Sequence, residues 1–264
     1  MTRKCFFVHG VEAESGFITL SERVSHHVEN VLRCRVADTI EVRDGHGNAW
    51  AGEIVEIRKG NIRVRLLERL DAAHVESPLE IVLGLALARP EKMDLVIRQV
   101  TEMGVTRLGA FQSKRSQYGL AGEKALKRSG RWSKIVREAM CQCGRTHAPE
   151  IGLFESLDGW LDSIRSAGEG EGFPLKVFAW EGEKVGSLRA KWKAGQRFPA
   201  VLAAVGPEGG WDSGEVEKLM AAGFEPISLG PRILRYETAA IALISAIQLL
   251  WGDMGGAGQG RQTI

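Results

Sequence analysis

Two short loops rich in glycine and proline carry the residues of this chain whose types and spacing could do chemistry. The first runs Val205-Gly206-Pro207-Glu208-Gly209-Gly210, and the second runs Leu229-Gly230-Pro231-Arg232 and on from Ile233 to Ala239. Glycine lets a ligand approach the main chain closely, and proline stiffens the loop around it. Free backbone N–H and C=O groups in two such loops, set side by side, can read an adenine edge or a ribose. The pair predicts a cofactor pocket walled by backbone.

Each loop lies between an apolar strand and a helix that must hold it in place. Residues 198–205 form an apolar run bounded by turn residues, as expected for a buried parallel strand. Asp212, with Glu215 three positions on, predicts a capping box at the start of a helix that ends near Ala222. The second loop follows a short strand at 226–229. It leads into residues 237–251, a helix apolar on nearly all faces, which predicts burial against a second subunit as well as the core.

The two parts of the chain carry different patterns. From residue 79 onward, apolar strands alternate with helices, beginning with a strand at 79–88 and a helix at 92–103, which predicts a parallel α/β sheet. The first 74 residues are predicted to be mostly β, with a helix candidate at 21–32 and a linker at 71–78. Three segments there alternate polar and apolar residues as half-buried strands do: 39–43, 49–57 and 61–66.

Composition excludes several classes of protein. The chain has 264 residues, 44% hydrophobic and 26% charged, as in ordinary globular proteins. Its longest apolar stretch, 239–251, is shorter than the roughly 20 residues that span a bilayer, and residues 1–5 do not resemble a signal peptide. We therefore expect a cytoplasmic protein with no membrane association. Four cysteines predict reduced thiols, and Cys141-Gln142-Cys143 with His147 lacks the second pair of a zinc site, so no metal is expected.

A basic window lies between Arg107 and Arg137, where nine lysines and arginines face a single glutamate. Such a run alone could be a solvated helix face. The interleaved Phe111, Gln117, Tyr118 and Trp132 favour RNA, because aromatic side chains stack on unpaired bases. On this view Lys114 and Arg115 are candidate RNA-binding residues.

The two loops resemble the signature of the SPOUT (knotted) methyltransferases, and most closely the RsmE-type family, which methylates N3 of a uridine in small-subunit (16S) ribosomal RNA. The other segments that resemble this family are Phe6-Phe7-Val8, His27 to Arg33, Asp44-Gly45, Lys92 to Val105, Ser113 to Ser116, Gln142 to Arg145 and Pro149 to Ile151. Two positions depart from the pattern. Cys141 stands where glutamate is common, and Arg89 stands where lysine is usual.

The resemblance implies an α/β fold with an N-terminal PUA-like small β-barrel at residues 1–74. It implies a C-terminal SPOUT methyltransferase domain at 75–264, with a trefoil knot at about 200–251 and a flexible tail at 252–264. The implied cofactor is S-adenosyl-L-methionine. The implied partners are small-subunit ribosomal RNA or the assembled small ribosomal subunit, and a second copy of the chain in a homodimer.

The resemblance also assigns roles to residues. Because uracil N3 must lose a proton, Arg232 or Arg235 would stabilise the anion, and Glu208 or Glu237 would accept the proton. Glu237 could instead be structural, at the N-terminus of the last helix. The expected RNA-binding residues are Arg33, Lys114, Arg115, Gln142 and Arg145. The expected cofactor-binding residues are Val205, Gly206, Pro207, Glu208, Gly209, Leu229, Gly230, Arg232, Ile233, Leu234 and Thr238.

Two other functions are compatible with the sequence. A knotted methyltransferase could act on another RNA, such as a tRNA ribose 2′-hydroxyl. A non-catalytic RNA-binding protein of ribosome assembly could retain the fold, although a disused pocket would tolerate residues bulkier than glycine.

Overall fold

The computed structural model describes residues 4–8, 16–20, 24–25, 34–58, 60–119, 123–166 and 175–255. Most of the predicted helix at 21–32, Arg33 and most of the predicted tail lie outside these ranges. The contacts divide the chain into two compact units. The first comprises residues 1–76 and 137–148, and the second comprises 77–136 and 149–264.

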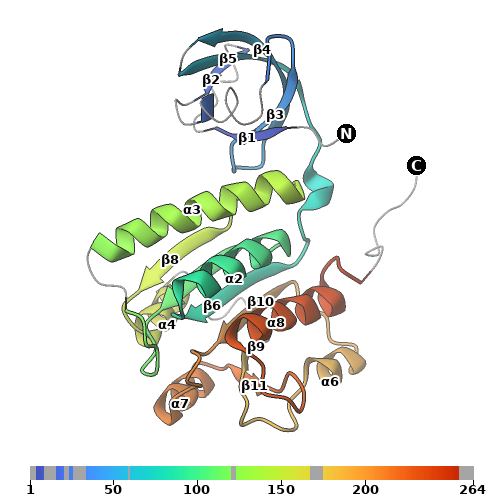
Figure 1. Ribbon diagram of the computed structural model, residues 1–264. Helices are drawn as coiled ribbons and strands as arrows, with labels where there is room; N and C mark the ends of the chain where they lie inside the picture. Colours follow the sequence, from blue (N-terminus) through green and yellow to red (C-terminus); the bar gives the residue numbers. More distant parts are fainter. Residues whose placement is uncertain are drawn as a thin grey trace. The chain divides into compact units, whose positions relative to one another are not determined.

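The first unit contains a five-stranded sheet that curves around its own core (Figure 1). Its order is β1-β3-β4-β5-β2, antiparallel except that β1 pairs with β3 in parallel. The alternation predicted for 39–43 and 61–66 is confirmed, since Ile40, Val42, Ile62 and Val64 are fully buried between more exposed residues. The alternation predicted for 49–57 is not, because residues 49–52 are all buried, next to a register shift in the pairing with β5. The strands are β1 (Cys5–Phe7), β2 (Phe17–Leu20), β3 (Thr39–Arg43), β4 (Ala49–Arg58) and β5 (Asn61–Arg69). The 3-10 helix η2 (Ala73–Val75) lies within the predicted linker.

The second unit is built on a six-stranded parallel sheet of order β11-β9-β10-β6-β7-β8, which confirms the predicted α/β class. Its strands are β6 (Glu80–Ala86), β7 (Arg107–Phe111), β8 (Glu150–Phe154), β9 (Leu175–Ala179), β10 (Ala200–Val205) and β11 (Glu225–Ile227). Its helices are α2 (Pro90–Glu102), α4 (Leu157–Ser166), α6 (Leu188–Lys193), α7 (Ser213–Ala221) and α8 (Tyr236–Trp251). Helix α3 (Glu123–Cys143) begins in the second unit and ends in the first.

Helices α4 and α7 bury their apolar sides in one core with alternate residues of the central strands. Trp160 of α4 lies directly over Gly84 and Gly109 on neighbouring strands, where an added Cβ would collide with its indole ring. Those two glycines are therefore needed for a bulky aromatic residue to pack flat on the sheet. Phe111 stacks on the same ring at 5.3 Å between centroids.

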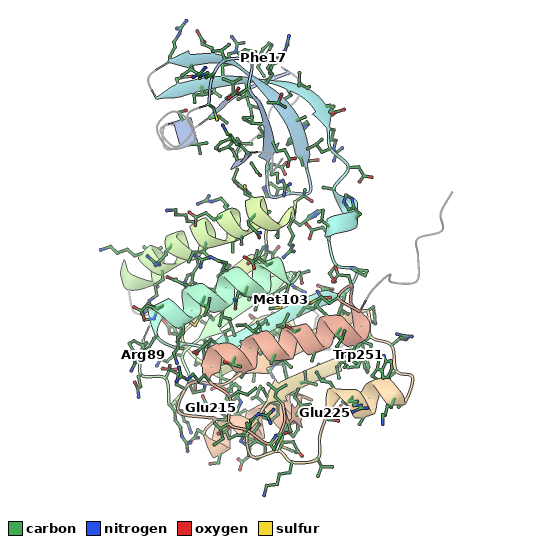
Figure 2. All side chains as sticks on the ribbon, turned by 45° about the vertical axis from the view of Figure 1, so that its right-hand side comes forward. Phe17, Arg89, Met103, Glu215, Glu225 and Trp251 are labelled. Atoms are coloured by element: carbon green, nitrogen blue, oxygen red, sulfur yellow. The ribbon has the colours of Figure 1, made fainter. Side chains whose placement is uncertain are left out.

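Helix α2 packs against α8, as the α2 and α8 ribbons show in Figures 1 and 2. The fully buried Gln248 donates a hydrogen bond of 2.7 Å to the carbonyl of Met103, just beyond the end of α2. The expectation that α8 is buried on several sides is met only in part. Leu243, Ile244 and Ile247 are buried, whereas Leu249 is 59% exposed.

Local signals were accurate in the second unit. The capping box is present. The Asp212 carboxylate accepts from the backbone N–H of Gly214 at 3.1 Å, and the Glu215 carboxylate accepts from the N–H of Asp212 at 3.2 Å. Gly223 follows the helix with a φ of 84°. No helix in the described ranges is long and apolar enough to cross a membrane. The knot, and a domain boundary at residue 74, stay predictions.

Candidate active site

A cavity of about 500 Å³ lies at the carboxyl ends of β9, β10 and β11, three adjacent strands of the parallel sheet. Ligands of parallel α/β sheets commonly bind at this edge. Four segments line the cavity: 179–181 after β9, 205–211 after β10, 228–230 after β11, and 232–236 leading into α8. Lys92 from α2 and Ala239 complete it. The two loops singled out in the sequence therefore lie on one cavity, together with a third segment that was not foreseen.

The structure brings together most of the residues predicted to bind the cofactor. All of them line the cavity except Thr238, which is exposed and lies outside the lining. Of the predicted catalytic residues, Glu208, Arg232 and Arg235 also line it. Their individual roles stay predictions.

Two glycines in these loops adopt backbone angles that other residues rarely take. Gly210 has a φ of 73° and Gly230 a φ of 112°. An added Cβ at Gly210 would also collide with the carboxylate of Glu181, and one at Gly206 would lie 2.8 Å from the ring of Trp211. The loops therefore need glycine to let Glu181 and Trp211 close the cavity wall.

A three-residue ion bridge crosses the cavity rim. The ammonium of Lys92 lies 2.5 Å from a carboxylate oxygen of Glu208 and 3.2 Å from one of Glu237. The Glu208 carboxylate raises the pKa of Lys92. Burial opposes ionisation of Glu237, but its own backbone N–H and Lys92 hold its pKa below the usual range. Sequence reasoning missed Lys92, although its place just beyond the carboxyl end of β6 was a usable signal.

Tyr236 also lines the cavity, near Glu208 and Glu237. It is buried, and its hydroxyl lies 3.1 Å from the sulfur of Met93. Burial, reinforced by the charges of Glu208 and Glu237, raises the pKa of Tyr236. Its phenol therefore stays neutral and cannot serve as a base near neutral pH.

The second loop presents cations to solvent. Arg232 and Arg235 are exposed, and Ile233 between them is 89% exposed. Within the described residues neither arginine has a hydrogen-bond or ion-pair partner for its side chain. Both guanidinium groups are available to bind an anionic or electron-rich ligand at the cavity mouth.

Glu215 anchors the segment that carries two predicted RNA-binding residues, Lys114 and Arg115, beside the first glycine loop. Its buried carboxylate accepts hydrogen bonds from the Ser113 hydroxyl at 2.9 Å and the Lys114 amide at 3.0 Å. The Lys114 ammonium lies 2.6 Å from Asp212, which raises the pKa of Lys114. Arg115 donates to the carbonyl of Gly209 at 3.3 Å. Lys114 and Arg115 are thus exposed cations on the segment after β7, held against the first glycine loop.

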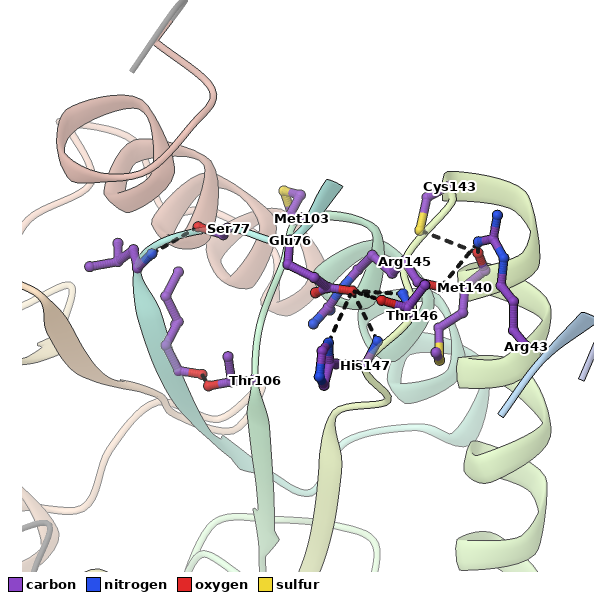
Figure 3. A network of polar contacts seen from close by, with 12 residues as sticks. Arg43, Glu76, Ser77, Met103, Thr106, Met140, Cys143, Arg145, Thr146 and His147 are labelled. Atoms are coloured by element: carbon purple, nitrogen blue, oxygen red, sulfur yellow. Dashed lines mark hydrogen bonds and ion pairs between the residues drawn. The ribbon is translucent and has the colours of Figure 1, made fainter. Parts of the chain in front are cut away.

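Two other predicted RNA-binding residues, Gln142 and Arg145, belong to the first unit. Gln142 is exposed, whereas Arg145 is buried and lies 2.9 Å from a carboxylate oxygen of Glu76. Figure 3 shows Glu76 at the centre of this network. It accepts the amides of Thr146 at 2.7 Å and His147 at 2.9 Å. Burial opposes ionisation, but the His147 amide and the Arg145 charge lower the pKa of Glu76.

One expectation about the basic window was wrong. Phe111 and Trp132 are both fully buried, so neither can stack on an RNA base. Cations and aromatics alternate there because β7 and α3 each have one face in the core, which carries the aromatic side chains. Arg131 is also engaged, in an ion pair of 2.5 Å with Asp94. Cys141 and Cys143 lie on α3. No cluster of His, Cys, Asp or Glu suited to a metal ion occurs within the described ranges.

Comparisons with known proteins match both units. The family of RNA methyltransferase domains matches residues 75–248, and the RNA methyltransferase PUA domain matches residues 20–67. The chain is 31% identical to ribosomal RNA small subunit methyltransferase E of Bacillus subtilis, over 92% of this chain and 95% of that protein. It is also 31% identical to the protein of that name from Buchnera aphidicola, over 90% and 92%.

Two solved structures are similar over nearly the whole chain. One is ribosomal RNA small subunit methyltransferase E from Neisseria gonorrhoeae bound to S-adenosyl methionine. It is 30% identical with a TM-score of 0.82, and the match covers 95% of this chain and 99% of that one. The other is a methyltransferase from Legionella pneumophila with bound SAM, 28% identical with a TM-score of 0.82, covering 96% and 100%.

Proposed function

The chain belongs to the RsmE-type family of RNA methyltransferases, and we propose that it methylates N3 of a uridine in small-subunit ribosomal RNA with S-adenosylmethionine as donor. The observation that carries the proposal is the cavity in the second unit. It is walled by two glycine loops. Gly206 and Gly210 of the first leave no room for a Cβ, and Gly230 of the second has a left-handed φ of 112°. Two arginines without partners among the described residues stand at the cavity mouth. The two similar structures that hold the same cofactor support the choice of donor.

The residues present fit this cofactor. A cavity of about 500 Å³ is within the roughly 300–1,000 Å³ usual for cofactor sites. The main chain of 205–210 and 229–234 would hold it, with Trp180 and Trp211 offering aromatic surface and Glu181 a carboxylate. When bound, the cofactor supplies an electrophilic methyl group on a sulfonium.

The chain's own residues would supply positioning and charge. Holding donor and acceptor in line can lower the barrier to methyl transfer by up to roughly 7–11 kcal/mol. Arg232 or Arg235 would stabilise the uracil anion that forms as the N3 proton leaves. Glu208 or Glu237 would accept that proton; Lys92 lies between the two carboxylates and keeps them near each other.

The RNA would be held by cations on both units. Lys114 and Arg115, exposed beside the first glycine loop, are suited to phosphate contacts. Arg33, Gln142 and Arg145 would contribute from the first unit, Arg145 by fixing its loop through Glu76. We propose residues 1–74 as the RNA-binding domain and 75–264 as the knotted methyltransferase domain.

We further propose that the protein works in the cytoplasm as a homodimer. Leu249 of α8 and Ile233 of the second loop are large apolar side chains that are 59% and 89% exposed. Burying each in a second copy would contribute about 1.5–3 kcal/mol. Light scattering at micromolar concentration should give twice the chain mass, and a monomer would remove this part of the proposal.

A methylation assay tests the function directly. The purified chain is incubated with labelled S-adenosylmethionine and small ribosomal subunits from cells that lack this gene, and the nucleosides are identified by mass spectrometry. We expect labelled 3-methyluridine. In a parallel reaction with tRNA as substrate, label on a ribose 2′-hydroxyl would move the target. Absence of both methylation and cofactor binding would favour a non-catalytic RNA-binding protein.

A further inference from the structure

Lys92 is the only lining residue contributed by α2, and it contacts two acids from different segments. Glu208 belongs to the loop after β10, and Glu237 to the first turn of α8. The three side chains are between 17% and 28% exposed, so water screens the bridge only in part. Through this one ammonium, three chain segments meet at the cavity rim.

The bridge also determines what the nearby arginines can do. Burial opposes ionisation of Glu237, while the backbone N–H of Glu237 and the Lys92 ammonium lower its pKa. Arg235 is close enough to Glu237 to lower this pKa further. Without Lys92, two carboxylates would face each other with no cation between them. A guanidinium forms ion pairs with carboxylates readily, so Arg235 would be drawn to them.

We propose that Lys92 is a positioning residue for the methyl transfer. By bridging Glu208 and Glu237, it fastens the first glycine loop to the start of α8. With both acids engaged in this way, Arg232 and Arg235 keep their guanidinium groups for the substrate. The proposal rests on the function proposed above but makes a claim about the ligand-free chain that can be tested alone.

The test compares Lys92→Met with Lys92→Arg, which keeps the charge. Arg98→Met is the matched control, because Arg98 is an exposed cation on the same helix outside the cavity. Cofactor affinity is followed by the fluorescence of Trp180 and Trp211, which line the cavity. Turnover is measured with the small subunit as substrate.

We expect Lys92→Met to lower kcat roughly tenfold or more while the cofactor Kd changes less than about threefold. Lys92→Arg should retain most of the turnover, and Arg98→Met should match the wild type. Unchanged turnover in Lys92→Met would overturn the proposal. So would an equal loss in Lys92→Arg, because charge would then not be what matters.

A second readout needs no methylation. In the ligand-free chain with ¹³C-labelled glutamate carboxyls, Lys92→Met should raise the pKa of Glu237, because the hydrogen bond and charge of Lys92 help to hold that pKa low. Lys92→Arg should not. If the wild type methylates no RNA, the proposed function fails while this titration still tests the bridge; identical titrations in wild type and Lys92→Met would overturn the bridge itself.

A separate observation concerns two cysteines of the first unit. The sulfur atoms of Cys5, on β1, and Cys141, near the end of α3, lie 2.9 Å apart although the residues are 136 positions apart. Both are partly exposed, so a small oxidant can reach them. Arg43 donates hydrogen bonds to the carbonyls of Met140 and Arg145, which fixes its positive charge beside Cys141.

The pair differs in reactivity. The hydrogen bond from Cys5, opposed by burial and aided by Arg43, lowers the pKa of the Cys141 thiol. The same contact and burial raise the pKa of Cys5. A thiolate is the form that attacks oxidants, so Cys141 is the nucleophile of the pair.

The geometry points to Cys5 and Cys141 as a site of reversible oxidation by hydroperoxides. The Cys141 thiolate attacks the outer peroxide oxygen, forming an S–O bond as the O–O bond breaks, and the alkoxide or hydroxide released takes up a proton. The Cys5 thiol then displaces the hydroxyl from the Cys141 sulfenic acid, giving a disulfide and water. The two sulfurs together lose two electrons, and the peroxide gains them.

Non-reducing peptide mass spectrometry after treatment with hydrogen peroxide tests this. We expect a linked Cys5–Cys141 peptide, removed by dithiothreitol and absent in Cys5→Ser, where dimedone should label Cys141. Cys143→Ser is the matched control, because Cys143 lies two residues beyond Cys141 on the same helix. This variant should still form the link. The linked form should melt roughly 5 °C or more above the reduced one. A Cys141–Cys143 or intermolecular disulfide instead, or no loss of thiols, would overturn the assignment.

Discussion

Replacing Glu76 with alanine is expected to destabilise the first unit by disconnecting the segment that follows α3. The Glu76 carboxylate accepts two backbone amides and the guanidinium of Arg145 (Figure 3). Arg43 holds the same segment from the other side, through the Arg145 carbonyl at 3.1 Å. Alanine at position 76 would remove the acid that pairs with the enclosed Arg145 charge.

The magnitude follows from burial. Arg145 is 3% exposed, and removing one partner of a buried ion pair costs roughly 3–5 kcal/mol because the other charge stays desolvated. The Glu76 side chain is 19% exposed, so water can partly replace it, which places the expected loss near the lower limit, at about 3 kcal/mol. Glu80→Ala is the matched control. Glu80 is 47% exposed in its pair with Arg107, and such a surface pair contributes less than about 1 kcal/mol.

Hydrogen exchange of peptides covering 144–148, read by mass spectrometry, measures this loss locally. A change of about 3 kcal/mol corresponds to roughly a hundredfold faster exchange. Equal protection in Glu76→Ala and Glu80→Ala would refute the reasoning, because the network would then contribute nothing beyond a surface pair.

The same carboxylate makes the stability depend on pH in a definite direction. The folded state lowers the pKa of Glu76 below its unfolded value of about 4.3. A lowered acid pKa contributes stability that is complete above the unfolded value and is lost as the pH falls through the folded one. The advantage of the wild type over Glu76→Gln should therefore shrink as the pH drops below about 4.

Three further predictions concern the cavity and helix α7 beside it. Glu215→Ala removes a buried carboxylate that accepts three hydrogen bonds. It should lower the free energy of unfolding, measured by urea titration, by about 3 kcal/mol, and a loss below about 1 kcal/mol would contradict this. Gly210→Ala should weaken cofactor binding at least about tenfold by fluorescence titration, because its left-handed φ and the adjacent Glu181 leave no room for a Cβ; wild-type affinity would count against the pocket. Arg232→Ala and Arg235→Ala should lower turnover while sparing cofactor affinity in equilibrium binding, and unchanged turnover in both would remove their assigned role.

Much of the fold could be predicted because its signals are local. The alternation in 39–43 and 61–66, the apolar run that became β10, and the capping box at Asp212 all depend on neighbours a few positions away. The loops at Gly206 and Gly230 were found in the same way, since glycine and proline mark tight turns wherever they occur. Aromatics in the basic window were misjudged because sequence spacing does not say which face of an element is buried. Trp132 and Phe111 point into the core.

The sequence by itself therefore determined the class of the sheet, the two glycine loops and the family. Only the tertiary structure decided which distant charges meet. Lys92 lies more than a hundred positions from both of its acids, Glu76 is 69 positions from Arg145, and Cys5 is 136 from Cys141. Such pairs form because packing of the strands and helices brings their ends together, and the energy of each contact depends on burial that no local pattern encodes.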